Sequence, residues 1–423
     1  MLLEFAFENF KSFRDLSVLS MDAISKETES DLYTRVIERN KSKILKTKAI
    51  YGANASGKSN LIMALVSFWK IVNGNLLDDD ILANYYNPFR LDNDKMSEPT
   101  YFQIIFEDEG DKYRYGFEFD HEKIHSEWLF LKRNPEITTD EDGKLVKKKT
   151  KEVCLFDRQG QNFDELNSSG FKEGKVLQQG IKMFTEKTLA VAVLDQLSAP
   201  VSSLVRDFIS KKISISANLP KQSDNIWHAQ TISLIDSNPE FKDWMSSLLH
   251  EVDHSIIGYK LETFVAPDGQ KFKIPLVIRG SGKRVSDFVL VKEEAAGTNK
   301  IFDYGSVIYR SLTEGKILII DEMDALLHPK LTRKIIELFQ SPDSHEDAQL
   351  IFATHDTNLM DKNLLRRDQI TFVDKSKDSV SEIFDLSDIK GVRSDDLFER
   401  NYLKGNYGAL PTLTNLEKIL LNG

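Results

Sequence analysis

The stretch Ile50-Tyr51-Gly52-Ala53-Asn54-Ala55-Ser56-Gly57-Lys58-Ser59-Asn60 decides the fold of this chain. Residues 52–59 fit the phosphate-binding loop (P-loop) pattern G-x-x-x-x-G-K-[ST] at every fixed position. Gly52 and Gly57 permit a tight turn and a close approach of the backbone to phosphate, so that the loop amides can cradle an anion. Lys58 can bring a positive charge to the phosphates, and the hydroxyl of Ser59 is a suitable ligand for Mg²⁺.

The segments on either side of this loop support the same interpretation. Residues 48–51 are typical of the end of a short strand, and residues 59–70 form a strong helix pattern with apolar positions at 61, 62, 65, 66, 68 and 69. A strand, a glycine-rich loop and a helix together aim a helix N-terminus at an anion. A chance glycine-rich turn is the alternative, and these flanks argue against it. We therefore expect residues 52–60 to bind a nucleoside triphosphate, which the resemblance described below identifies as ATP.

The composition limits the class of protein. The chain has 423 residues, 41% of them hydrophobic and 29% charged, which is ordinary for a soluble globular protein of two or three units or of one core with insertions. The net charge of −10 argues against a nucleic-acid footprint over the whole surface. Cys154 is the single cysteine, so we expect no disulfide framework and a reducing cytoplasmic location. The sequence shows no signal peptide and no apolar run long enough to cross a membrane.

The first half of the chain is rich in strand patterns. We expect strands at residues 2–7 and 16–21, helix rather than strand at 22–45, and a loop at 78–93. From residue 100 to 158 the apolar positions alternate with a period of two, which predicts an antiparallel meander with one covered face. We interpret its aromatic residues as packing on that face, and residues 140–151 as a solvated hairpin tip.

The second half alternates between helices and buried strands. We expect a buried strand or helix at 187–197, mainly helix at 202–251, and strands with a turn at 267–269 within 261–291. Helices are then expected at 298–312, 330–340 and 358–367, and strands at 317–320, 349–353, 369–373 and 379–386. The nucleotide-binding elements thus lie at both ends of the chain. This favours one nucleotide-binding head with a large insertion over consecutive domains.

Two later strands supply the expected partners of the P-loop. Residues 317–320 are four consecutive apolar residues followed by Asp321 and Glu322. Asp321 can hold Mg²⁺ through water together with Ser59, and Glu322 can accept a proton from the attacking water. His355 follows the strand at 349–353 and can reach the γ-phosphate; a capping histidine at the sheet edge is the alternative.

The order of these motifs resembles that of ABC-type ATPase heads, a pattern shared by SMC, RecF and OLD-type proteins. In detail the chain resembles the bacterial AAA-15-type ATPases, which include RloA and the ATPase of PARIS-type anti-phage systems. The resemblance spans nearly the whole chain, and it is carried by residues 7–13, 51–60, 87–91, 297–298, 321–329, 353–356 and 402–411.

The resemblance implies an α/β fold, an ABC-type P-loop head built from a mixed sheet and an antiparallel β subdomain, with a helical and β-hairpin insertion. We divide the chain into residues 1–99, the first part of the head; 100–197, the antiparallel subdomain; 198–290, the insertion; and 291–423, the second part of the head. It also implies an ATPase that needs Mg²⁺.

The resemblance further implies a site shared by two copies of the chain. The signature residues Ala296, Gly297 and Thr298 of one copy would contact the ATP held by the other. Leu327 and His328 match the loop that crosses the dimer interface. Ala295 and Ala296 stand where many relatives carry serine, which removes a possible phosphate contact. The resemblance assigns catalytic roles to Lys58, Glu322 and His355, and metal-binding roles to Ser59, Asp321 and Gln196. For Gln196 a plain surface glutamine is the alternative.

We therefore expect a cytoplasmic ATPase that forms head-to-head dimers or larger homo-oligomers and acts as the sensor or regulator of an anti-phage system with a separately encoded effector. A RecF- or SMC-like ATPase that acts on DNA in repair is the main alternative, which the net charge of −10 does not favour. A transport ATPase is the third class; the N-terminal strand pattern, the loop containing His328 and the β-rich insertion weigh against it.

Overall fold

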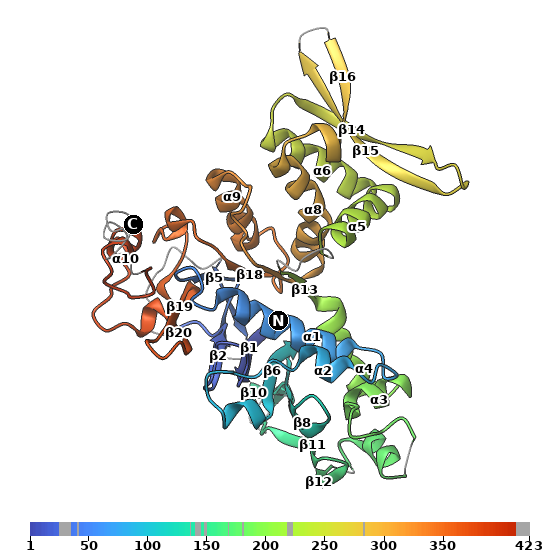
Figure 1. Cartoon of the computed structure of the whole chain (residues 1–423), viewed down its shortest axis with the longest axis vertical. Coiled ribbons are helices and arrows are strands. Elements are labelled where there is room, and N and C mark those ends of the chain that lie inside the picture. The colour runs from blue at the N-terminus through green and yellow to red at the C-terminus, as the bar shows by residue number, and fades with distance from the viewer. Residues whose placement is uncertain are drawn as a thin grey trace, which may run out of the picture.

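The computed structural model describes residues 1–24, 35–39, 42–135, 137–139, 145–147, 150–167, 169–179, 182–217, 223–281 and 284–411. Within these residues, two large sheets enclose helix α1 (Lys58–Asn73), and a smaller sheet projects away from them at the top of Figure 1. The P-loop lies between strand β5 (Thr47–Tyr51) and α1.

The first large sheet is the expected antiparallel meander, extended by the N-terminal strands. In spatial order it contains β12 (Asn162–Leu166), β11 (Val153–Gln159), β8 (Ile124–Lys132), β7 (Asp111–Phe119), β6 (Thr100–Asp108), β1 (Leu2–Glu8) and β2 (Ser17–Ser20). Its aromatic face packs on α1, where the rings of Phe68 and Phe117 stack with centroids 5.7 Å apart. This is the one covered face that the alternation predicts.

The second large sheet carries the P-loop. Its order is β13 (Ile213–Ser216), β17 (Ile317–Ile320), β18 (Gln349–Ala353), β5, β19 (Ile370–Lys375) and β20 (Ser381–Asp385). The strands from β13 to β19 are parallel, and β20 is an antiparallel edge. Four of them, β5, β17, β18 and most of β19, are fully buried because helices or the first sheet cover both faces. Their carboxyl ends therefore meet at one edge, where the P-loop begins.

Helices α8 (Ala296–Glu314) and α9 (Pro329–Gln340) cover the face of this sheet that lies opposite α1. The sequence explains where α8 ends and where α9 begins. Gly315 closes α8 in the left-handed conformation with φ 66°, and Pro329 occupies the first turn of α9, where its missing N–H costs nothing.

The projecting part contains α5 (Ser223–Ser237), α6 (Pro239–Val252), β14 (Ile256–Val265), β15 (Lys271–Ser281), β16 (Arg284–Val289) and α7 (Leu290–Glu293). Its three strands form an antiparallel sheet whose base packs on α6 and α8 in a core of its own, while the hairpins extend outward (Figure 1). Asn238 caps α6 by accepting from the amide of Phe241 at 2.9 Å.

The remaining elements are short. They are β3 (Val36–Arg39), β4 (Ser42–Leu45), β9 (Ile137–Thr139), β10 (Leu145–Lys147), α2 (Ile81–Tyr85), α3 (Ala190–Gln196), α4 (Pro200–Asp207), α10 (Phe398–Leu403), the π-helix η4 (Phe208–Lys212), and the 3₁₀ turns η2 (Lys95–Ser97), η3 (Lys172–Gln179), η5 (Thr357–Leu359), η6 (Arg367–Gln369) and η7 (Leu386–Asp388).

The expected α/β fold, with a mixed sheet, an antiparallel β unit and a helical and hairpin insertion, is confirmed. The division into four units at residues 99, 197 and 290 stays a prediction. Residues 140–144 and 148–149 of the predicted hairpin tip lie outside the described residues, as do 25–34 and 40–41 of the segment predicted as helix.

Three local predictions are wrong. Most described residues of 22–45 form the strands β3 and β4, because branched residues pair across the two strands, Val36 with Leu45 and Ile37 with Ile44. Helix α2 lies within the predicted loop at 78–93. Residues 358–367 form turns, because the carboxylates of Asp356 and Asp361 accept the amides of Asn358 at 3.0 Å and Asn363 at 2.9 Å and so compete with helix. The prediction of mainly helix at 202–251 is confirmed among the described residues, with the short strand β13 as an exception.

Candidate functional site

The P-loop connects β5 to α1 through a backbone path that only small residues can follow. A Cβ on Gly52 would stand 2.2 Å from the carbonyl oxygen of Val373, and Gly57 has φ 126°, a conformation that L-residues rarely adopt. Asn54 and Ala55 at the tip are exposed, and Ala55 is itself left-handed with φ 63°. The loop is therefore rigid at its base and open to solvent at its tip.

Two serines from distant parts of the chain brace this loop, a contact that the sequence did not reveal. The hydroxyl of Ser381 donates to the carbonyl oxygen of Ser56 at 2.5 Å and lies 2.8 Å from the hydroxyl of Ser12. Ser12 in turn accepts from the side chain of Asn60 at 2.8 Å. The N-terminal turn and the edge strand β20 thus fix the loop from one side.

Lys58 folds back over its own loop. Its ammonium donates to the carbonyl oxygens of Gly52 at 2.8 Å and Ala53 at 3.1 Å. Burial lowers the pKa of Lys58, while the nearby Asp321 and Glu322 act in the opposite direction. The loop thus holds a pre-placed positive charge whose present partners are two neutral carbonyls, which phosphate oxygens could replace.

Asp321 and Glu322 follow β17, which is separated from β5 by the single strand β18. Asp321 is only 4% exposed, and its amide donates to the carbonyl oxygen of Ser216 at 2.8 Å. Burial raises the pKa of Asp321, whereas a hydrogen bond from Ser59 lowers it. Its Oδ1 atom is buried without a hydrogen-bond partner.

This arrangement fits a magnesium ion. An unpartnered buried carboxylate oxygen is costly in a folded protein unless a ligand satisfies it. Here that oxygen belongs to a side chain that is bonded to the first-turn serine of the P-loop helix. A hard divalent cation prefers such carboxylate and hydroxyl oxygens. Ser59 and Asp321 would therefore hold Mg²⁺, together with the phosphates of a bound nucleotide.

Glu322 stands in the left-handed region with φ 50°, and its side chain is half-buried. A non-glycine residue in this conformation is uncommon, and such residues gather at functional sites. The amide of Met323 donates to the carbonyl oxygen of Ala353 at 3.0 Å, so the chain turns sharply after Asp321 and stays attached to β18.

His355 follows β18 at the same edge of the sheet and is exposed. Its amide lies 3.3 Å from Oδ1 of Asp324, a residue that the sequence analysis did not single out although it lies two positions after Glu322. Desolvation and the nearby charge of Lys58 lower the pKa of His355, so the imidazole is neutral near pH 7. The structure thus brings Lys58, Asp321, Glu322 and His355 to one edge.

Gly297, Thr298, Leu327 and His328, four of the predicted signature and interface residues, line one groove. Ala296 is exposed, Gly297 is half-buried and Thr298 is buried in the first turn of α8. Leu327 is buried, while the exposed His328 caps α9 by accepting from the amide of Lys330 at 3.2 Å. A groove of about 1280 Å³ runs between this loop, α6, and the first turns of α8 and α9.

The structure does not bring Gln196 to this site. Gln196 is the exposed last residue of α3. Its neighbour Asp195 accepts from Arg206 at 2.6 Å, and Arg206 also donates to the carbonyl oxygen of Val72 at 3.0 Å. Val72 lies near the C-terminal end of α1, about 20 Å along the helix from Lys58. Gln196 therefore has the placement of a surface glutamine.

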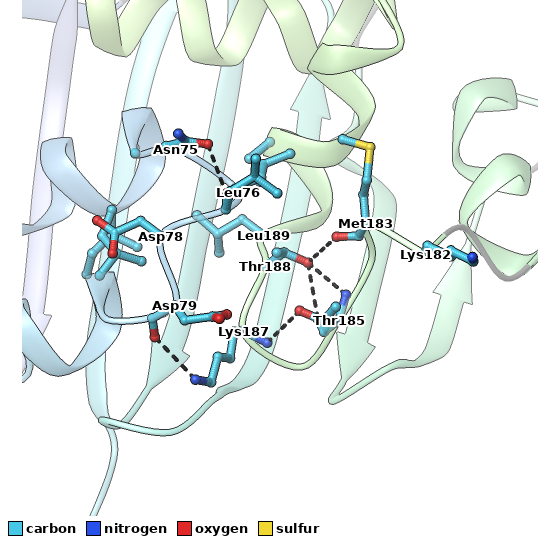
Figure 2. Close-up of a pocket in the computed structure, with 15 residues that line it drawn as sticks. Asn75, Leu76, Asp78, Asp79, Lys182, Met183, Thr185, Lys187, Thr188 and Leu189 are labelled. Atoms are coloured by element: carbon cyan, nitrogen blue, oxygen red, sulfur yellow. Dashed lines mark hydrogen bonds between the residues drawn. The ribbon is translucent and has the colours of Figure 1, made fainter.

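A separate cavity of about 360 Å³ lies at this same far end of α1 (Figure 2). Two of the residues that line it make hydrogen bonds there. The ammonium of Lys187 donates to the carbonyl oxygen of Asp79 at 3.2 Å, and the hydroxyl of Thr188 donates to the carbonyl oxygen of Met183 at 3.0 Å. Lys187 and Asp79 face each other across the opening in Figure 2. Because it lies a helix length from the P-loop, this cavity is not part of the nucleotide site.

The described residues contain neither a metal-binding cluster nor a membrane-spanning helix. No group of three or more histidine, cysteine or acidic side chains is placed there to hold a metal ion. No helix in this part of the chain is long and apolar enough to cross a membrane.

Comparison with protein families finds a match to the family described as "AAA domain, putative AbiEii toxin, Type IV TA system" over residues 49–159 and 287–361, which is less than half of the chain. No curated protein matches. Among solved structures, the SMC head bound to the C-terminal winged-helix domain of ScpA is similar at 15% identity and a TM-score of 0.45, over 91% of this chain and 97% of that one. The SMC head domain from Thermotoga maritima is similar at 16% identity and a TM-score of 0.39, over 91% and 98%.

The two segments matched by the family contain both halves of the site. The first holds the P-loop, and the second holds Gly297, Asp321, Glu322 and His355. The AAA domain described by this family therefore matches the parts of the chain that form the P-loop edge.

Proposed function

We propose that this chain binds ATP with Mg²⁺ at residues 52–60 and hydrolyses it. The proposal rests on the buried Oδ1 of Asp321, which has no hydrogen-bond partner. The side chain of Asp321 is hydrogen-bonded to Ser59 at the sheet edge where the P-loop starts. A purely structural aspartate would be satisfied within the protein. The family match to an AAA domain over the same residues supports the same conclusion.

Each residue has a task in this reaction, which is phosphoryl transfer to water. The loop amides and Lys58 bind the phosphates once Lys58 leaves the carbonyls of Gly52 and Ala53. Bound Mg²⁺ would neutralise phosphate charge. Glu322 orients the attacking water and accepts its proton. His355, neutral at pH 7, donates a hydrogen bond toward the γ-phosphate.

We further propose that two copies of the chain complete the site. Gly297 in the first turn of α8 and the exposed His328 at the start of α9 line the same groove. Two helix N-termini that open onto one surface favour an anion presented by a second molecule. The phosphates held on the P-loop of another copy meet that description.

The biological role that we propose is the sensor or regulator of an anti-phage system. The matching family is described by a toxin of a toxin–antitoxin system, and the net charge of −10 does not favour a broad DNA-binding surface. An effector encoded nearby would carry the toxic activity. DNA repair is the competing role.

The enzymatic proposal is tested by ATP turnover and by light scattering. Wild-type protein should hydrolyse ATP with Mg²⁺, Lys58→Met should not bind nucleotide, and Glu322→Gln should bind it without turnover and form dimers or larger particles. Glu240→Gln, an exposed glutamate in the first turn of α6, is the matched control. Turnover that survives Glu322→Gln would refute the assigned base, and an unchanged particle size with ATP would refute the shared site.

The role is tested by infection and by co-purification. Cells that carry the gene with its neighbours should resist phage, and Lys58→Met should abolish that resistance. A stable complex with the product of the neighbouring gene is expected. A lone protein that binds DNA ends with ATP in a salt-dependent manner would instead support repair.

A further inference from the structure

Lys300 links the first turns of α8 to the Asp-Glu loop. Its ammonium donates to the carbonyl oxygen of Glu322 at 3.1 Å and to that of Ala325 at 2.7 Å. We propose that Lys300 is a positioning residue that sets the orientation of Glu322. This inference rests on the proposed ATPase activity and adds to it a residue that does not itself contact the nucleotide.

The loop after β17 needs such a contact because its backbone is strained. Glu322 and Leu326 both stand in the left-handed region, with φ 50° and φ 67°. Non-glycine residues persist there only where the surroundings fix them. The carbonyl oxygen of Glu322 also accepts from the amide of Ala325 at 3.1 Å, which closes a tight turn. Lys300 holds the two carbonyls at the beginning and the end of that turn.

Lys300 is itself held in place from the other side. Its ammonium lies 5.3 Å from the centre of the ring of Tyr304, one turn further along α8. The hydroxyl of Tyr304 lies 3.5 Å from that of Ser216, whose carbonyl oxygen accepts the amide of Asp321 at 2.8 Å. The contacts therefore form a closed ring through β13, the Asp-Glu loop and α8. The backbone on both sides of the Asp321–Glu322 peptide is fixed by it.

The signature glycine rests on the same loop. A Cβ on Gly297 would stand 2.7 Å from the carbonyl oxygen of Leu326, so a side chain at this position would displace the loop. Lys300 lies three residues after Gly297 and hence on the same helix face. A ligand that contacts residues 296–298 would thus act on Glu322 through Lys300.

The test separates positioning from folding and from binding. Lys300→Met keeps the approximate length of the side chain but removes the N–H donors and the positive charge that lies over the ring of Tyr304. We expect kcat to fall about tenfold to a hundredfold, the cost of a small misplacement of a catalytic group, while KM and the melting shift caused by ATP stay within about twofold of wild type. Lys300→Arg should restore part of the loss, because a guanidinium can also donate to two carbonyls. Lys211→Met, at an exposed lysine paired with Asp207 at 2.8 Å, is the control.

A double-mutant cycle shows through which residue Lys300 acts. In the Glu322→Gln background, Lys300→Met should cause little further loss of the residual single-turnover rate, because both changes remove the same function. Multiplicative losses would overturn the inference, as would an unchanged kcat in Lys300→Met. Lost nucleotide binding in Lys300→Met would also overturn it, since Lys300 would then be needed for the fold. If the wild type does not hydrolyse ATP, the proposed function fails first, whatever Lys300 does.

Discussion

Replacing Asp321 by asparagine should make the ligand-free protein more stable and at the same time abolish its response to magnesium. Asp321 is 4% exposed, its Oδ1 has no partner, and burial raises its pKa. A buried acceptor without a partner costs about 1–3 kcal/mol, and more when it is charged. Asparagine keeps the shape of the side chain and removes the charge. We therefore expect Asp321→Asn to gain about 1–2 kcal/mol in free energy of unfolding.

The gain is small but measurable in a melting experiment. An unfolding entropy of about 2.1 cal/mol/K per residue, over 423 residues, gives about 0.9 kcal/mol per degree. The melting temperature of Asp321→Asn should therefore rise by about 1–2 °C without nucleotide. Asp395→Asn, at an exposed aspartate, should leave it unchanged. The measurement is differential scanning calorimetry of the three proteins side by side.

With nucleotide, the melting temperature of the wild type should exceed that of Asp321→Asn. ATP with Mg²⁺ at a hundred times its dissociation constant stabilises the wild type by about 2.7 kcal/mol, or about 3 °C with the same entropy. Asp321→Asn should lose most of the part of this shift that requires Mg²⁺, because a neutral amide is a poorer ligand for a hard cation. A variant that melts below the wild type without nucleotide and keeps the full magnesium-dependent shift would refute the reasoning.

The pH dependence of stability gives an independent check that Asp321→Asn stabilises the ligand-free protein. The pKa of Asp321 is raised, so the folded protein holds this proton more tightly than the unfolded chain does. The cost of the buried charge is present above the raised pKa and disappears as the pH falls below the unfolded value of about 4. The advantage of Asp321→Asn in the ligand-free state should therefore be largest near pH 7 and shrink towards pH 4. An advantage that grows on acidification would contradict this account.

Two further predictions concern the frame around the site. Glu127→Gln should cost about 3–5 kcal/mol in chemical denaturation, because Glu127 and Arg158 form an ion pair whose side chains are both 0% exposed and removing one charge leaves the other buried. Gly297→Ala should lower ATP turnover severalfold, since its Cβ would meet Leu326. Gly258→Ala, whose Cβ would find its nearest neighbour 4.0 Å away, should leave turnover unchanged.

The sequence was sufficient for the strands that end at the site. Residues 317–320 are a short apolar run, residues 349–353 are apolar apart from Gln349, and the structure has β17 and β18 with the same limits. A strand buried on both faces leaves this nearly continuous apolar signal, because both sets of side chains are removed from water. Asp321 and His355 could be placed at one sheet edge for the same reason.

The strand next to β17 could not be predicted in this way. β13 is the four-residue sequence Ile213-Ser214-Ile215-Ser216, which lies in a region of helical composition. Its parallel partner β17 begins about a hundred residues later, so the pairing that makes it a strand is not local. The position of Gln196 could not be predicted for a related reason. Its place in the chain matched the resemblance, but the end of α3 is held at the far end of α1 by Arg206.

The difference between local sequence signals and contacts with distant residues also explains which site residues the motifs do not reveal. Asp321 and Glu322 follow a strand directly and Lys58 is a fixed position of the P-loop pattern, so a pattern along the chain reveals them. Lys300 acts through carbonyl oxygens 22 and 25 residues away, and any backbone presents a carbonyl whatever its side chain is. A lysine at that helix position is therefore indistinguishable in sequence from a solvated one. It follows that positions which bond to the backbone of the Asp-Glu loop, rather than further acidic residues, are where undetected determinants of turnover should be sought in this chain.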